Sequence, residues 1–378
     1  MDIETVKAFL WALHRAQQTV WEWLGALGLL PLLHGQPEWP FAQRLAAEQL
    51  LFDHGQARRL MLSLGAIVCA VVLLLLAIAW RRARRWLFGL GVLLLLVTPW
   101  PQWSLLTVST TPTSFHQSPT AFGAASIVQG QALYATYCLR CHGTDGSGEG
   151  PEAANLPMWP PTLNGKLMWA RTEGELFWRV RYGLRDAQRR ETMPGTALGD
   201  AQVWAVLDFV RAQAAGQTLR RTGAWTFPVR MPEATVHCLG RDRYLTALRG
   251  QRVRLALNPD DERELNDDPR LVTVSVGTPS TEVDCYSTDP LLETALGVLI
   301  GVAPAELSGY SLIADRDGWL RVRGRPGLNW SSDDLVCKAD ARASSQGAAI
   351  AESGEGIDAL IRRMDREPVR QVSGGFPH

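Results

Sequence analysis

Residues 138–142 of this chain are Cys138-Leu139-Arg140-Cys141-His142. On one helical turn, two such thiols can bond the two vinyl groups of a single porphyrin, and the histidine that follows can bind the iron. This spacing, C-x-x-C-H, is the attachment signature of c-type haem. The alternatives are a dithiol redox motif or half of a zinc site, but no further cysteine or histidine follows before His237 and Cys238. The stretch therefore predicts one covalently bound haem c.

The sequence around this motif, from about Ser126 to Gly216, resembles the class I cytochrome c family. The resemblance implies an all-α domain in which Ser126 caps a helix and Gly130 lets a closing helix, Asp200–Ala214, approach closely. It also implies that the backbone of Pro160-Pro161 lies against the proximal histidine, His142.

In that family the second axial ligand is a methionine in a loop before the closing helix. Met193, in the sequence T-M-P-G, has this position, and Met158, Met168 and His116 are the alternatives. Ligation by His142 and Met193 would occupy both axial positions and raise the haem potential. Because such an iron has no open position, the pattern favours electron transfer over catalysis.

Apolar sequence in the first hundred residues indicates a membrane. Leu60–Trp80 contains no charged side chain and would extend about 31 Å as a helix, enough to cross hydrocarbon. Trp86–Val97 continues as a second apolar run, so we predict two transmembrane helices within residues 60–104. Arginines at 81, 82, 84 and 85 predict a cytoplasmic loop between them. The haem motif and everything after it would then lie in the periplasm, at a bacterial inner membrane.

Residues 1–59 form a tryptophan-rich segment with two possible structures. Phe9–Leu33 is apolar but carries polar and charged side chains, so it is either a third span or a helix lying in the membrane interface. A cleavable signal peptide is not expected, because Asp2 and Glu4 precede the lone Lys7. A short stretch here, which includes Ala12-Leu13-His14, Trp21 and Gly25, resembles the copper-resistance D membrane family.

Charge excludes one class of partner and suggests another. Lys+Arg and Asp+Glu are both 38, so the chain lacks the basic excess that nucleic-acid binding needs. Five arginines nevertheless lie against one acid, Asp186, just before Met193, and we predict that they dock an acidic redox partner. They are Arg179, Arg181, Arg185, Arg189 and Arg190.

Short strands and helices alternate over residues 234–367, after a linker at 217–233. The sequences Leu245-x-x-Leu248-Arg249-Gly250 and Leu312-Ile313-Ala314-Asp315-x-Asp317-Gly318 resemble the peroxiredoxin and copper-chaperone branch of the thioredoxin-like superfamily. That branch places reactive cysteines where this chain has Asn258-Pro259-Asp260-Asp261. Since no thiolate nucleophile can form there, we predict a redox-silent docking or spacer domain.

Three cysteines, Cys238, Cys285 and Cys337, follow in this region. In an oxidising compartment they predict one disulfide and one buried thiol, and the sequence does not select the pair. The alternative is a soft-metal site that includes His237.

The predicted architecture is therefore multidomain. Transmembrane helices and a linker at 105–125 precede an all-α cytochrome c domain at 126–216, and an α/β thioredoxin-like domain and a tail at 368–378 follow it. The predicted function is a membrane-anchored periplasmic cytochrome, more a non-catalytic subunit than an enzyme, that exchanges single electrons with a respiratory or dehydrogenase partner. The alternative is an oxidase-assembly or copper-handling factor with a haem domain, which the missing cysteine pair opposes.

Overall fold

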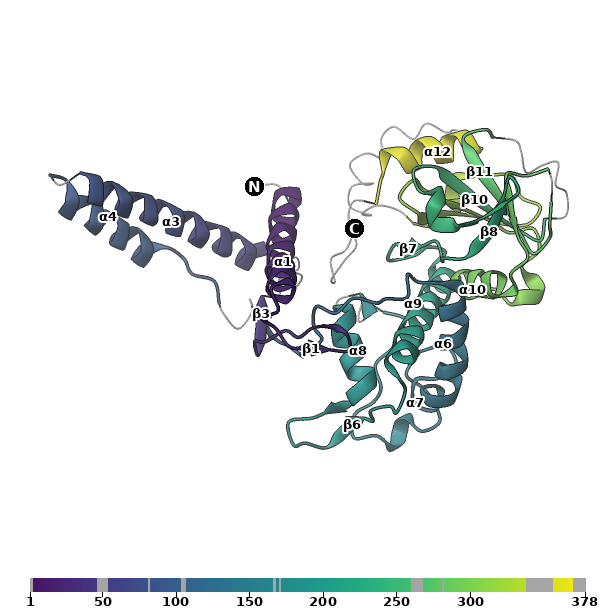
Figure 1. Cartoon of the computed structure of the whole chain (residues 1–378), viewed down its shortest axis with the longest axis horizontal. Helices are drawn as coiled ribbons and strands as arrows, with labels where there is room; N and C mark the ends of the chain where they lie inside the picture. The colour runs from purple at the N-terminus through teal and green to yellow at the C-terminus, as the bar shows by residue number, and fades with distance from the viewer. Residues whose placement is uncertain are drawn as a thin grey trace. The chain divides into compact units, whose positions relative to one another are not determined.

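The computed structural model describes residues 3–45, 54–80, 82–102, 107–165, 168–169, 171–259, 268–280, 282–337 and 356–369. The chain forms two compact units, Met1–His116 (unit 1) and Gln117–His378 (unit 2) (Figure 1). Of the predicted features, Arg81, Asp260, Asp261 and the tail after Val369 lie outside the described residues.

Unit 1 combines helices with two short antiparallel hairpins. Its elements are α1 (Ile3–Ala26), β1 (Leu32–Leu33), β2 (Gln36–Pro37), β3 (Gln43–Leu45), α3 (His54–Ala79), α4 (Arg84–Val97) and β4 (Thr107–Ser109). Strand β1 pairs with β2, and β3 pairs with β4 although α3 and α4 lie between them in the sequence. This second pairing brings both ends of the α3–α4 hairpin together.

A small aromatic core holds α1 to the segment before unit 2. Trp21 and Trp39 lie with their ring centroids 5.8 Å and 4.7 Å from that of Phe115. Nε1 of Trp21 donates to the Pro37 carbonyl at 3.1 Å, and Nε2 of His116 lies 3.0 Å from the same oxygen. Because these side chains meet across distant parts of the sequence, they fix the fold of unit 1.

One helix in the described residues is long and apolar enough to cross a membrane. It is Arg58–Ala79, within α3, with 22 residues and a mean hydropathy of 2.9. Helix α4 has only 14 residues, about 21 Å, against about 30 Å of hydrocarbon. It stops because Thr98 adopts an extended conformation before Pro99, and Oγ1 of Thr98 bonds the Leu94 carbonyl. The prediction of two transmembrane helices is therefore wrong.

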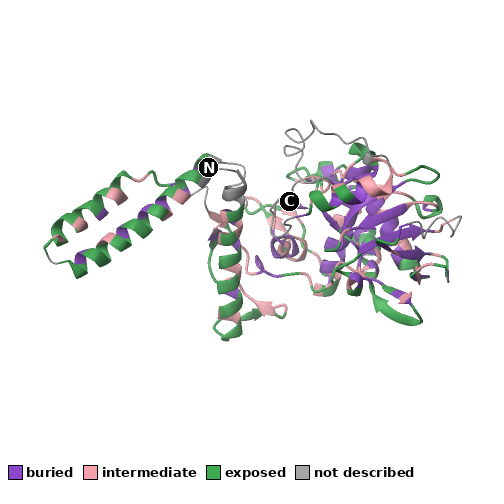
Figure 2. Ribbon diagram, turned by 90° about the horizontal axis from the view of Figure 1, so that it is seen from above, coloured by how far each residue is buried: buried purple, intermediate pink, exposed green. Residues whose placement is uncertain are grey.

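Both α3 and α4 are largely exposed (Figure 2). Only 22% of the apolar window in α3 is buried, which a core helix of a soluble protein would not allow. The exposed side chains are large and apolar, including Val68, Leu75, Ile78, Leu93 and Leu96.

The first part of unit 2 is helical. It consists of α6 (Ala124–Tyr137), α7 (Leu139–His142), the 3-10 turn η1 (Ala153–Asn155), α8 (Glu173–Tyr182), the hairpin β5 (Leu184–Arg185) and β6 (Glu191–Met193), and α9 (Asp200–Thr222). Helix α9 continues past its predicted end at Ala214, so the predicted linker begins as helix. Ser126 does not cap α6, because Gly123 is the N-cap and Oγ of Ser126 donates to buried Asp208 at 2.7 Å.

The second part of unit 2 is an eight-stranded mixed sheet with strand order β7-β14-β13-β10-β11-β12-β8-β9. The strands are β7 (Val229–Arg230), β8 (Thr235–Cys238), β9 (Arg241–Tyr244), β10 (Arg252–Leu257), β11 (Leu271–Val276), β12 (Cys285–Ser287), β13 (Ser311–Ala314) and β14 (Trp319–Gly324). Helices α10 (Pro290–Ile300) and α12 (Ile357–Arg366) accompany them, with 3-10 turns η3 (Leu245–Leu248), η5 (Pro304–Glu306) and η6 (Ser332–Asp334). Strand β10 pairs parallel with β11 and antiparallel with β13.

Helix α10 joins the two parts of unit 2 into one body. It packs against α6 and α9, and a Cβ added at Gly216 of α9 would overlap the carbonyl of Val298. One buried cluster runs from Phe177 and Trp204 through Leu296 to Leu255 and Leu312 in the sheet. Because α10 is apolar on most of its surface, it can be buried on more than one face, as this position between the helices and the sheet requires.

This architecture corrects the predicted fold class. Alternating short strands and helices were predicted over residues 234–367, and most of the elements found there are of these kinds; the helix α10 among them begins at Asp289, which accepts from Leu291 N at 2.9 Å. The assembly of these elements was not predicted: the sheet has eight strands of mixed direction instead of a thioredoxin-like arrangement, and it shares a core with the helical part. The predicted series of separate all-α and thioredoxin-like domains is therefore wrong.

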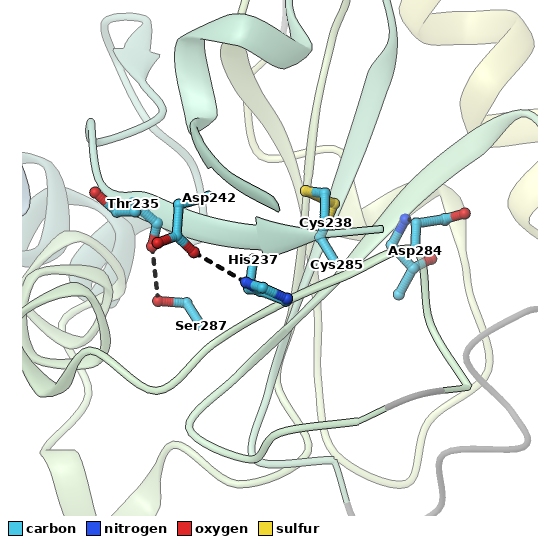
Figure 3. Close-up of a disulfide and its surroundings, with 8 residues drawn as sticks. Thr235, His237, Cys238, Asp242, Asp284, Cys285 and Ser287 are labelled. Carbon is cyan, nitrogen blue, oxygen red and sulfur yellow. Dashed lines mark hydrogen bonds and ion pairs between the residues drawn. A yellow bond between two sulfur atoms is a disulfide. The ribbon is translucent and has the colours of Figure 1, made fainter. Parts of the chain in front are cut away.

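The predicted disulfide is present, between Cys238 and Cys285 on adjacent strands (Figure 3). Cys337 is buried outside any disulfide, and burial raises the pKa of its thiol to about 11. Nδ1 of His237 lies 2.9 Å from Oδ1 of Asp242, and successive residues on a strand point to opposite faces. His237 and Cys238 are therefore separated by the sheet, which is not the arrangement of a shared soft-metal site.

Candidate haem site

Helix α7 brings the C-x-x-C-H residues onto a single turn. The amides of Cys141 and His142 both donate to the carbonyl of Cys138, at 3.1 and 2.9 Å. The turn ends at Gly143, whose φ of +78° favours glycine, and the hydroxyl of Tyr134 donates to the Gly143 carbonyl at 2.8 Å. Tyr134 was not predicted, and its position one helical turn before Cys138 is the signal that could have identified it.

Both thiols of this turn are protonated and outside any disulfide. Burial raises the pKa of Cys138 to about 11, with a further contribution from Cys141, and burial also raises the pKa of Cys141. A dithiol redox motif depends on a thiolate, so these pKa shifts oppose that alternative. Within the described ranges, no three Cys, His or acidic side chains are placed so that they could hold a metal ion.

The imidazole of His142 is neutral and has an unsatisfied nitrogen. Burial lowers its pKa, and the backbone of Pro161 partly opposes this shift, although Nδ1 reaches no full hydrogen bond within the described residues. The predicted approach of Pro160-Pro161 to His142 is confirmed. Because the Pro161 backbone favours a proton on Nδ1, Nε2 keeps the lone pair that a metal requires.

These residues fit haem c. Two protonated thiols on one turn can form two thioethers, and a neutral imidazole oriented from its Nδ1 side is the usual proximal ligand. Figure 1 shows α7 and the β5–β6 hairpin at the same end of unit 2, away from the large sheet.

Met193 lies on β6, paired with Leu184 and partly buried. The turn that follows α8 holds it, because Gly183 packs so closely on Met193 and Gly195 that an added Cβ would overlap their backbones. The alternatives lie elsewhere: Met168 is 3% exposed in the core cluster and Met158 is 58% exposed. His116 belongs to unit 1.

The five arginines before Met193 differ in their exposure to solvent. Arg179 and Arg181 are partly buried on α8, where Nη1 of Arg181 donates to the Thr196 carbonyl at 2.8 Å. Arg185, Arg189 and Arg190 are exposed on the β5–β6 hairpin. Nε of Arg190 forms a 2.7 Å ion pair with Asp186, which leaves Arg185 and Arg189 as the more available charges.

Comparison with known proteins supports a cytochrome in this part of the chain. Residues 125–210 match the sequence family described as cytochrome c oxidase, cbb3-type, subunit III. These residues form a c-type cytochrome domain. Such a domain implies haem c and electron transfer.

The other comparisons add little. No curated protein matches the chain. A chain of the reducing HAO-like protein complex of Kuenenia stuttgartiensis is similar at 17% identity, over 32% of this chain and 59% of that one, with a TM-score of 0.23. A TM-score this low does not establish a shared fold.

The contact between α6 and α9 in the cytochrome domain can be tested at Gly130. A Cβ there would overlap the carbonyl of Ala205 and crowd Cβ of Phe209, so Gly130→Ala should force the two helices apart. Overpacking costs about 1–3 kcal/mol, more than the ~1 kcal/mol that alanine gains in helix propensity. We expect a lower unfolding temperature in a thermal melt followed by Soret absorbance.

The control is Gly199→Ala, at the N-cap of α9, where φ is −68° and the nearest atom to an added Cβ lies at 3.7 Å. It should change the melting temperature much less. Equal effects of the two substitutions would contradict the close helix crossing.

Proposed function

We propose that this protein is a membrane-anchored carrier of single electrons. The observation that carries the proposal is a c-type cytochrome domain whose two thiols and neutral imidazole share one helical turn. When bound, haem c supplies a one-electron iron couple. Cys138 and Cys141 would attach the haem covalently, and His142 and Met193 would bind its iron.

Met193 is proposed as the distal ligand because its competitors have other roles. Met168 already fills the hydrophobic core, and Met158 points into solvent. Met193 is partly buried, and its backbone packs on the Gly183 turn, so the structure fixes the point from which its side chain extends. With His142 and Met193 both bound to the iron, no position would remain for a substrate, which supports electron transfer over catalysis.

A redox titration of the purified protein tests the function. One haem per chain should titrate as a single one-electron couple, and the reduced protein should not bind carbon monoxide. Ready carbon monoxide binding would show an open iron position, and a haem enzyme would replace the carrier as the proposed function.

Docking is proposed at the β5–β6 hairpin. Arg185 and Arg189 are exposed on the segment that leads to Met193, where opposite charge on a redox partner would speed encounter. The partner would be a respiratory or dehydrogenase protein with an acidic surface. Its association rate should fall as ionic strength rises.

Anchoring is proposed through Arg58–Ala79 of α3, the helix of the described residues that is long and apolar enough to cross a membrane. Unit 2 is proposed to lie in the periplasm of a bacterial cell, because c-type haem is attached in that compartment.

Reporter fusions test this location. An export-dependent phosphatase fused after His378 should be active, and a reporter that fluoresces only in the cytoplasm should be dark at the same site. The reverse result would overturn the periplasmic location of unit 2.

A further inference from the structure

An apolar groove runs along one face of α1 in unit 1. Its volume is about 260 Å³. Side chains three and four residues apart form one wall, and a short extended segment forms the other. The residues used below are Leu13, Ala16, Val20 and Leu24 on α1, with Trp39 and Phe41 opposite.

The polar side chains that line the groove are hydrogen-bonded to the backbone of unit 1. The indole N–H groups of Trp21 and Trp39, which line the groove, donate to the carbonyls of Pro37 and Gln43. The amide of Gln17 bonds the backbone of Leu45 at both its nitrogen and its oxygen. Nε2 of Gln17 donates to the Leu45 carbonyl at 3.1 Å, and Oε1 accepts from the Leu45 amide at 3.1 Å. The groove therefore suits hydrocarbon, and its side chains offer no hydrogen bond to a sugar, phosphate or quinone headgroup. It is also smaller than the ~300 Å³ at which pockets for whole small molecules begin.

The surroundings of the groove are exposed and apolar. At its rim, Val20 is 55% and Phe41 59% exposed. Further large apolar side chains, with exposures from 55% to 69%, continue along the end of α1 and the β1 segment. They are Trp23, Leu27, Leu29 and Leu32. A continuous apolar surface of this kind marks contact with a protein or a membrane.

The rest of unit 1 favours the membrane. Arg58–Ala79 belongs to the same compact unit, so the groove stays near any bilayer into which this helix inserts. Phe41, at the rim of the groove, lies two residues before β3 in the sequence. Strands β3 and β4 pair at the open end of the α3–α4 hairpin, and the arginines lie at the other end, its tip. Helix α1 carries Trp and Leu on one face, and its charged residues Arg15 and Glu22 are exposed elsewhere. This distribution is typical of helices that lie in the plane of the membrane interface.

We propose that the α1 groove holds an acyl chain of a membrane phospholipid, so that unit 1 lies in the periplasmic interface of the bilayer. The groove takes a segment of the chain, and Trp23, Leu27, Leu29 and Leu32 enter the acyl boundary around it. This proposal rests on the proposed membrane anchoring.

Photocrosslinking of the full-length protein tests it. Phe41→p-benzoylphenylalanine places a reactive ketone at the rim, and Tyr244→p-benzoylphenylalanine on β9, 64% exposed in unit 2, is the control. The proteins are reconstituted in nanodiscs of phosphatidylethanolamine and phosphatidylglycerol with added ubiquinone, irradiated, and analysed by mass spectrometry. We expect a phospholipid adduct at position 41, and at least a tenfold smaller yield at position 244.

Filling the groove should displace the lipid. Ala16→Leu projects into the groove and should reduce the adduct at position 41 at least fivefold. Ala12→Leu, on an exposed position of the same helix outside the groove, should leave the yield unchanged. Equal effects of the two substitutions would overturn the proposal.

The other outcomes are also informative. A ubiquinone adduct in place of phospholipid would overturn the choice of ligand, and a crosslink to another protein in native membranes would show that the face is a protein interface. Absence of any adduct from protein that remains in the membrane fraction would overturn the groove proposal alone. Protein that fails to enter membranes would overturn the anchoring, and this proposal with it.

Discussion

Replacing both Cys138 and Cys141 by serine should abolish covalent haem in this protein. A serine hydroxyl cannot form a thioether with a porphyrin vinyl group, and His142 alone provides only a reversible iron bond. We expect no peroxidase-active band at the mass of the chain in a denaturing gel, against a strong band for the unsubstituted protein. The loss should be complete, because both proposed attachment residues are replaced.

The matched control for this experiment is Cys69→Ser, in the exposed part of α3. It removes a thiol outside the cytochrome domain and should leave the haem stain at full strength. Haem that survives denaturation equally well in the double variant would contradict attachment at Cys138 and Cys141.

Replacing Met193 by alanine should change the ligation of the iron without removing the haem. A thioether is a soft ligand that favours ferrous iron, so its loss should lower the reduction potential. The expected fall is on the order of 0.1 V, within the ~0.8 V range that axial ligands cover. The variant should also lose the weak far-red absorption of methionine-ligated ferric haem and should bind carbon monoxide when reduced.

Met158→Ala is the cleaner control for Met193, because Met158 is exposed and its loss should leave the potential and the spectrum unchanged. Met168→Ala removes a core side chain and should lower stability by about 2–5 kcal/mol without opening the iron. If Met193→Ala kept its far-red band and one of the other variants lost it, the proposed ligand would be wrong.

The cytochrome site could be predicted because its chemistry is local. Two thiols and an imidazole that serve one porphyrin must lie on a single turn, so their spacing appears directly in Cys138 to His142. Gly130 was predicted from a family resemblance, and its close contact with Ala205 confirms the approach of α6 and α9. Alternating short strands and helices over residues 234–367 were also predicted, since alternation and turn residues act over a few positions.

The assembly of those elements could not be predicted in the same way. Strand order depends on contacts between residues far apart in the sequence, and no local pattern distinguishes an eight-stranded mixed sheet from a smaller one. The pairing of Cys238 with Cys285 depends on β8 and β12 lying side by side in that sheet. The shared core through α10 and the α1 groove arise only when distant segments pack.

The residues of this chain thus specify a haem turn, an apolar hairpin and a set of strands, each through interactions along a few neighbouring positions. Tertiary packing adds the rest. It joins the cytochrome helices to the sheet through Gly216 and α10, brings β3 to β4, and leaves Arg185 and Arg189 exposed beside Met193. The physical reason is that burial of apolar surface is not directional, so it selects a fold only through the shapes and distances of whole elements.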